Sequence, residues 1–156
     1  MSMSRTGTAS RAAGALRLYL WVVMPGLLVQ GAGSLLLDLR PDVRAATPVL
    51  LATVMNGNPP HAWLHIVWGL VGLFVLLAFR SAAARLGLGL IFGIFYTLLG
   101  FLGIAVHHPF AMRLELPENV FHLTVGPLML LLTWLASRDV SGAASLERPP
   151  AADAGR

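Results

Sequence analysis

The side chains best suited to chemistry in this sequence are its five histidines. Two of them have matching surroundings, because His65 and His122 each lie about one turn inside an apolar segment and each precedes a glycine by four residues. An imidazole inside hydrocarbon needs a polar partner, and ionisable groups in membrane segments are candidates for function. We therefore take His65 and His122 as a candidate pair.

Three interpretations of this pair stay open at the level of sequence. Neutral imidazoles could bind a transition metal such as Cu or Zn, or they could ligate the iron of a b-type haem. Alternatively, each ring could bond a backbone carbonyl or an asparagine and serve only packing, which is the interpretation that we favour from sequence alone. The residues expected to support the pair in any of these roles are Asn119, Gly69, Gly126, His61, His107 and His108.

Further kinds of chemistry find little support. The chain has no cysteine, which excludes thiolate metal sites and disulfides. The apolar segments contain no Asp, Glu or Arg, although such groups are usual near the midplane of ion-coupled transporters. We identify no catalytic residues and expect no enzyme, and a small transporter or channel is the least favoured function.

The elements that must position the histidines are four apolar runs. Hydrophobic residues make up 56% of the chain and charged residues only 12%, which is too little charge for the surface of a soluble domain. Each run is long enough to cross the hydrocarbon core as a helix, and a helix satisfies its own backbone hydrogen bonds there. The predicted spans are 18–37, 62–79, 86–106 and 120–136.

The segments outside these runs differ in character. We expect residues 1–17 and 138–156 to be disordered cytoplasmic tails around a membrane domain of residues 18–137. Residues 38–60 form the longest loop, and its mildly apolar stretch Pro48–Met55 is too short to span and could lie in the membrane interface. The first run continues beyond a small-residue motif that resembles a cleavage site, so we expect it to remain as a helix.

The arginines predict the orientation. All eleven basic residues are arginine, and cytoplasmic segments carry the excess of positive charge. With both termini inside, the inner segments hold Arg5, Arg11, Arg17, Arg80, Arg85, Arg138, Arg148 and Arg156, and the outer loops hold Arg40, Arg44 and Arg113. The arginines border apolar spans, so we expect a lipid bilayer as partner and no nucleic acid. The composition suggests a bacterial cytoplasmic membrane.

An internal repeat relates the two halves. Residues 61–69 resemble residues 118–126, and each segment follows a glycine-rich run. Small residues at helical spacing allow helices to approach closely in lipid, and similar stripes occur on each predicted helix. The first helix offers Gly26, Gln30 and Gly33. The clearest stripe, on the third helix, consists of Gly89, Gly93, Gly100 and Gly103, with Tyr96 on the same face.

The pattern resembles a family of small bacterial four-span membrane proteins known only as a domain of unknown function. That family shows Asn-x-x-His-x-x-x-Gly at the start of its second and fourth helices. Asn119, His122 and Gly126 match the motif, whereas Ala62 replaces the asparagine before His65. The resemblance implies an all-α, antiparallel four-helix membrane bundle of two hairpin repeats, and it implies no activity.

From the sequence, we expect an uncharacterised multi-pass protein that acts as a structural or interaction component of the membrane. It could form a homo-oligomer or join a membrane complex. Haem or metal binding at His65 and His122 is the second interpretation of its function.

Overall fold

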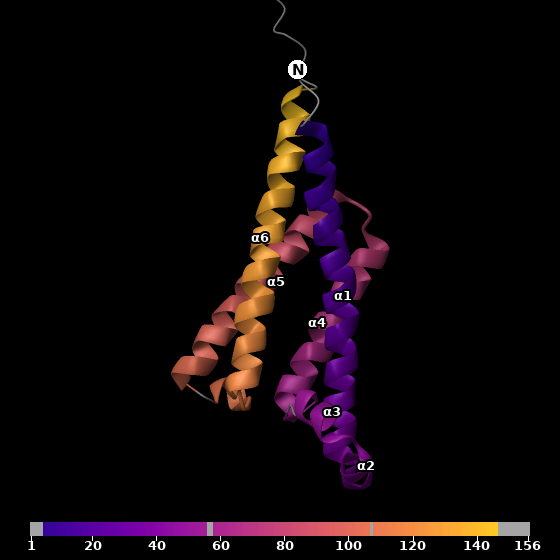
Figure 1. The fold of residues 1–156 in the computed structure, drawn as a ribbon, viewed down its shortest axis with the longest axis vertical. Coiled ribbons are helices and arrows are strands. Elements are labelled where there is room, and N and C mark those ends of the chain that lie inside the picture. The colour runs from indigo at the N-terminus through magenta and orange to yellow at the C-terminus, as the bar shows by residue number, and fades with distance from the viewer. Residues whose placement is uncertain (1–4, 56–57, 107, 147–156) are drawn as a thin grey trace, which may run out of the picture.

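The computed structural model describes residues 5–55, 58–106 and 108–146. This part of the chain is all helical and contains no strand (Figure 1). In chain order the elements are α1 (Arg5–Leu39), α2 (Pro41–Ala46), α3 (Val49–Val54), α4 (Pro59–Ala78), α5 (Ala82–Val106), the 3-10 turn η1 (Pro109–Ala111) and α6 (Leu116–Leu146).

Four of the described helices are long and apolar enough to cross a membrane, which confirms the predicted number of spans. The candidate spans are Arg11–Leu39, Pro59–Ala78, Ala82–Val106 and Leu116–Asp139. Large apolar side chains such as Leu18, Phe74 and Phe101 are more than half exposed along these helices. In water such a surface would be unstable, so these faces contact lipid.

The first and last helices are longer than their apolar runs. We predicted disorder for 1–17 and 138–156, but α1 already begins at Arg5 and α6 continues to Leu146. Alanine and arginine are strong helix formers, and this propensity favours continuation of both helices beyond the apolar runs. Residues 1–4 and 147–156 lie outside the described part of the chain.

The long connection after the first span is not an irregular loop, because it forms the two short helices α2 and α3. The predicted interfacial stretch Pro48–Met55 contains α3, whose apolar side chains Val49, Leu50 and Val54 are mostly exposed. This arrangement is typical of a segment that lies in a membrane interface.

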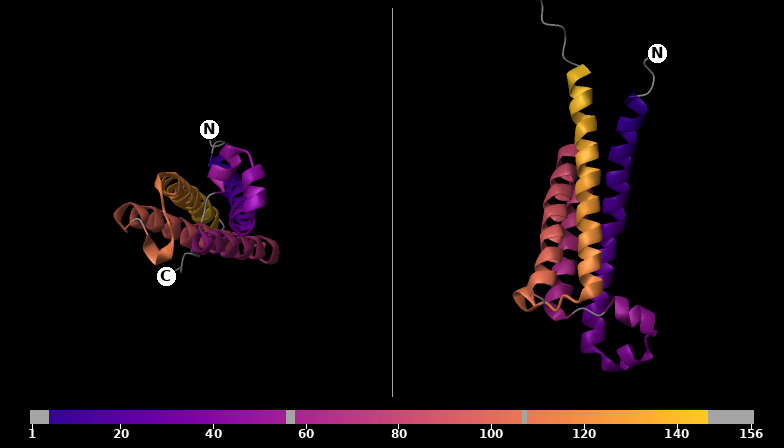
Figure 2. Two further views of the ribbon diagram at one scale, coloured as in Figure 1. Left: turned by 90° about the horizontal axis from the view of Figure 1, so that it is seen from below. Right: turned by 60° about the vertical axis from the view of Figure 1, so that its left-hand side comes forward.

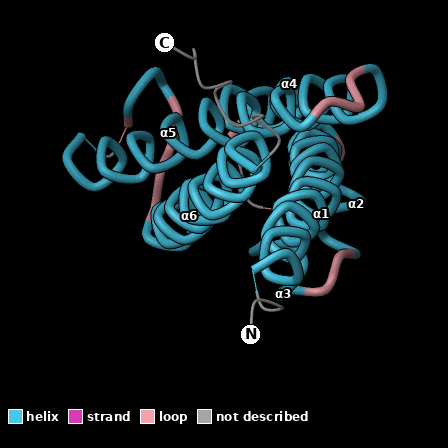
Figure 3. Tube along the Cα trace, turned by 90° about the horizontal axis from the view of Figure 1, so that it is seen from above, coloured by secondary structure: helices cyan, strands magenta, loops and turns pink. Residues whose placement is uncertain are grey.

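The long helices pack in pairs. Helix α1 runs beside α4, α5 runs beside α6, and α1 also packs against α6, while α4 and α5 touch only briefly. Viewed from the end, α1 and α6 lie next to each other, each with its own partner (Figure 3). The start of α1 and the end of α6 lie at one end of the molecule, and α2 and α3 lie at the other (Figure 2).

Glycines bring the paired helices together. A methyl group on Gly69 of α4 would stand 2.8 Å from the backbone nitrogen of Leu28 in α1. On Gly126 of α6 it would stand 2.6 Å from the backbone nitrogen of Thr97 in α5. Both positions require glycine, because the neighbouring backbones occupy the space of a side chain. The predicted stripe Gly89, Gly93, Gly100 and Gly103 also faces α6.

The half of the molecule nearer the termini has an apolar core. Leu20, Met24, Phe92 and Met129, from three helices, are completely buried there. Polar side chains instead gather in the other half, near α2 and α3.

Candidate functional site

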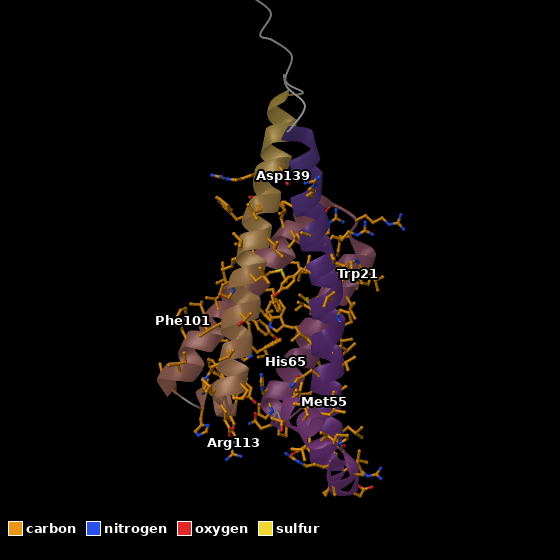
Figure 4. The ribbon with its side chains drawn as sticks, in the orientation of Figure 1. Trp21, Met55, His65, Phe101, Arg113 and Asp139 are labelled. Carbon is orange, nitrogen blue, oxygen red and sulfur yellow. The ribbon has the colours of Figure 1, made fainter. Side chains whose placement is uncertain are left out.

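Three histidines meet between α4 and α6. His61, His65 and His122 are 1%, 3% and 0% exposed, and one ring nitrogen of each lies within 4.8 Å of the others. His65 lies between α1 and α6, in the half of the molecule nearer α2 and α3 (Figure 4). Three imidazoles at such distances form a cluster that can hold a metal ion.

The helices explain why these rings converge. His61 and His65 are four residues apart, so they project from one face of α4. Gly69 lies one further turn along the same face and holds α4 against the backbone of α1. His122 occupies the equivalent place on α6, one turn before Gly126. Each glycine contact therefore fixes the rotation of its helix and directs the imidazoles inward.

The distance between ring nitrogens of His61 and His122, which come from different helices, fits a shared ligand. The Nε2 atoms of His61 and His122 are 3.4 Å apart, and the Nδ1 atom of each ring has no hydrogen-bond partner in the described structure. Two nitrogens bound at about 2.0–2.1 Å to a tetrahedral zinc ion stand roughly 3.3–3.4 Å apart. The same distance is also compatible with one ring donating a hydrogen bond to the other.

Gln30 of α1 orients the third ring. Its Oε1 accepts a hydrogen bond from Nδ1 of His65, so Nδ1 carries the proton and Nε2 keeps its lone pair. This Nε2 is buried and has no partner among the described residues. A polar group that bonds the far nitrogen of an imidazole is the usual support of a metal-binding histidine.

Gln30 also connects the site to the segment between α1 and α4. Its amide nitrogen donates to the hydroxyl of Ser34 at 3.2 Å and to the carbonyl of Val54, at the end of α3, at 3.4 Å. A single side chain thus bridges a histidine and the short helix α3.

Aromatic rings close the cluster on the side of α5. Tyr96 stacks on His65 with ring centroids 5.9 Å apart and meets His122 edge-on at 5.2 Å. Behind it, Phe92 stacks on Tyr96 at 4.1 Å. These rings separate the imidazoles from the apolar core, so access from that direction is blocked.

His61 and His65 also line a pocket of about 260 Å³, which Tyr96 does not line. His61, His65 and Gln30 form its inner wall, and Thr53 and Val54 of α3 form one side. The first turns of α6 complete it with Pro117, Glu118 and Phe121.

The structure brings together some of the predicted residues and leaves others aside. The rings of His65 and His122 are 6.0 Å apart between centroids, and His61 joins them. His108 is exposed in the segment after α5, and His107 lies outside the described residues. Asn119 does not bond a histidine, since its amide donates to the carbonyl of Leu114 at 3.1 Å.

Sequence reasoning missed three neighbours of the site, namely Gln30, Tyr96 and Glu118. Gln30 and Tyr96 share predicted helix faces with glycines. That signal indicates burial, but it does not indicate which side chain from another helix they meet. The only sequence feature that points to Glu118 is the similarity of residues 61–69 to residues 118–126, in which Glu118 aligns with His61.

A family described as a domain of unknown function (DUF4383) matches residues 43–135. The chain belongs to this family. The match includes all three histidines, Tyr96 and Glu118, whereas Gln30 precedes it. The resemblance noted from the sequence motifs is thereby confirmed, and DUF4383 brings no activity with it. Neither the curated proteins nor the solved structures gave a match.

The site is a poor fit for haem. A porphyrin would have to lie between the rings of His65 and His122, but His61 packs against both, with ring centroids 4.3 and 5.3 Å away. Phe121 and Tyr96 fill the neighbouring space, at 6.1 and 5.9 Å from His65. Three converging nitrogens suit a single ion better than a flat macrocycle.

Proposed function

We propose that this member of DUF4383 is a multi-pass membrane protein that binds one transition-metal ion through His61, His65 and His122. The observation that carries the proposal is the clustering of three buried imidazoles from two helices, with one ring nitrogen of each within 4.8 Å of the others. The sequence alone favoured a structural role, and the third imidazole is the reason that metal binding now ranks first.

The chemistry of the ligands selects the class of metal. Three neutral nitrogen ligands suit Zn or Cu, whereas Mg and Ca prefer oxygen. The described part of the chain offers no carboxylate within the cluster. Zinc also accepts the tetrahedral geometry that the 3.4 Å separation of the two Nε2 atoms supports.

We further infer that the four spans form an antiparallel bundle of two hairpin repeats in a bacterial cytoplasmic membrane, with both termini inside. The pairing of α1 with α4 and of α5 with α6 supports the two hairpins. The arginine distribution supports the orientation. In this orientation the metal site lies in the outer half of the membrane. Reporter fusions at residue 82 and at the C-terminus should then report cytoplasm, and fusions near residues 57 and 112 should report the outside.

The test of metal binding is elemental analysis of the purified full chain in detergent after exposure to Zn or Cu and removal of loosely bound ions. We expect about one ion per chain. His61→Ala, His65→Ala and His122→Ala should each reduce the bound metal to near zero, because two imidazoles cannot replace three. His108→Ala is the matched control, since this exposed histidine lies outside the cluster.

A thermal melt separates a metal site from a packing role. Added Zn should raise the melting temperature of the wild type, because an ion that binds only the folded state stabilises it by about 2.7 kcal/mol at 100 times its Kd. If the chain retains no metal and added Zn does not change its melting temperature, the three histidines serve packing and the proposal is refuted.

A further inference from the structure

The pocket beside the histidines raises the question of what else approaches the metal. Closed structural zinc sites use four protein ligands, and sites that exchange a ligand use three. Among the residues that the structure describes, the cluster has three members and no fourth. One coordination position therefore remains for a group from outside the protein.

Within the described structure, the open direction for that group is the pocket. Tyr96 covers the histidines on the side of α5, and α1 covers them through Gln30. The pocket reaches His61 and His65 from the side of α3 and the first turns of α6. Its volume of about 260 Å³ is below the range of roughly 300–1,000 Å³ typical of sites for drug-sized molecules. The pocket therefore suits a ligand smaller than a typical drug-sized molecule.

Most polar groups on the pocket wall already have partners. Gln30 uses both ends of its amide, and the hydroxyl of Thr53 donates to the carbonyl of Val49 at 2.8 Å. Apart from the free ring nitrogens of His61 and His65, the exception is Glu118, whose Oε2 is buried and has no partner within the described residues. The remaining walls, Val54, Pro117 and Phe121, are apolar.

We propose that this pocket binds a small neutral molecule that completes the coordination of the metal and donates a hydrogen bond to Glu118. The inference rests on the proposed metal site. Such a molecule combines a lone pair for the ion with an N–H or O–H group for the carboxylate, as an azole or a small alcohol does. The acidic side chain disfavours small anions, because like charges repel strongly where water is scarce.

The test uses the full chain in detergent loaded with Co(II), whose visible absorption reports its coordination. Imidazole is the neutral probe and azide is the anionic probe. Imidazole should change the spectrum saturably while the cobalt content stays constant, and azide should bind at least about tenfold more weakly. Glu118→Gln should strengthen azide binding about tenfold and weaken imidazole binding. Glu115→Gln is the matched control, because Glu115 is exposed and does not line the pocket.

A second variant tests whether the probe reaches the metal through the pocket. Val54→Trp should fill part of the pocket that Val54 lines and weaken imidazole binding at least tenfold, while the cobalt content remains that of the wild type. If Co(II) binds but neither probe changes its spectrum, or if Val54→Trp binds imidazole as the wild type does, the site is closed and the inference fails while the metal site stands. If Glu118→Gln behaves like Glu115→Gln, the assignment of Glu118 and of a neutral ligand is wrong. Failure to bind Co(II) at all would overturn both proposals.

Discussion

The two helix pairs, α1 with α4 and α5 with α6, pack through the same kind of glycine contact and differ in the segments that connect their helices. In both pairs a glycine four residues after a buried histidine touches the backbone of the partner helix, Gly69 on α1 and Gly126 on α5. The first pair is connected through α2 and α3, and the second through the short turn η1. The common feature is thus the close helix contact, and the difference lies in the connection.

The polar residues near the histidines differ in the same way. The first pair contributes His61, His65 and Gln30, while the second contributes His122 and Glu118. In the register of the repeat, His61 and Glu118 occupy matching positions, and both line the pocket. In the repeat and the metal site that we propose, one copy would carry a metal-ligating side chain at this position and the other a hydrogen-bonding carboxylate. The comparison predicts that packing variants act alike in the two pairs, and that site variants do not.

The largest effect is expected from adding a methyl group at the shared glycine. Gly126→Ala would place a carbon 2.6 Å from the backbone nitrogen of Thr97 and 3.0 Å from the carbonyl of Gly93. Because a backbone cannot move aside as a side chain can, α5 and α6 must separate. We expect a loss of about 3 kcal/mol or more, measured as the change in unfolding free energy in detergent.

The comparison requires that Gly69→Ala, which meets the backbone of Leu28, loses a similar amount. Gly87→Ala is the control, since nothing lies within 4 Å of that position and alanine favours a helix by roughly 0.5–1 kcal/mol over glycine. A large loss at only one of Gly69 and Gly126 would show that the two pairs do not pack alike.

A site variant in the first pair should lower the affinity for metal more than it lowers stability. Gln30→Ala removes the acceptor that fixes the tautomer of His65 and the donor that holds the end of α3. Loss of such an outer partner usually weakens metal binding about 10–100-fold, which a competition titration with a chelator would measure. Ser34→Ala removes only the 3.2 Å bond from Gln30 and should keep wild-type affinity. Equal affinities of Gln30→Ala and Ser34→Ala would contradict the role of Gln30.

A smaller effect is expected where the two pairs are tied together at the end that carries α2 and α3. Asn58 donates to the carbonyl of Ala111 at 2.6 Å and accepts from the backbone nitrogen of Arg113 at 3.2 Å. These bonds hold a turn in which Phe110 and Ala111 adopt positive φ values of 53° and 61°.

Asn58→Ala removes both bonds at about 0.5–1.5 kcal/mol each, so we expect a loss of about 1–2 kcal/mol in the free energy of unfolding. Asn58→Asp keeps the acceptor and should lose about half as much. Hydrogen exchange at the amide of Arg113 would report its hydrogen bond to Asn58 directly. Unchanged protection of this amide in Asn58→Ala would show that Asn58 does not connect the two helix pairs.

The smallest effect concerns the ion pair outside the membrane. Nη2 of Arg40 and Oδ2 of Asp42 are 2.7 Å apart, and both side chains are largely exposed. The hydrogen bond that Arg40 donates lowers the pKa of the Asp42 carboxyl below its ordinary value. A lowered pKa means that any stabilisation is present above the pKa of the unfolded chain and is lost as the pH falls through the folded value. Exposed ion pairs contribute little to the free energy of unfolding. Asp42→Asn should therefore leave the melting temperature unchanged at about pH 7 and about pH 3, and a clear drop at neutral pH alone would show that α2 depends on this pair.

Much of the fold could be predicted because lipid imposes simple rules. Spans of about 20 apolar residues must be helices, so 62–79 and 86–106 correspond closely to α4 and α5. The ends of α1 and α6 could not be predicted from hydropathy, because outside the bilayer a helix depends on propensity and neighbours. Within the site, His65 and His122 were identified from the repeat, but Gln30, Tyr96 and Glu118 were not.

The sequence by itself determined the number of spans, the family and the position of His65 and His122 about one turn inside their helices, since hydrophobic length and motif spacing are local properties of the chain. Only the tertiary structure decided that His61 joins the pair, that Gln30 turns from α1 to His65, and that the pocket opens beside α3. These facts depend on how each helix is rotated about its axis. That rotation is determined by contacts such as Gly69 with Leu28, between residues far apart in the chain.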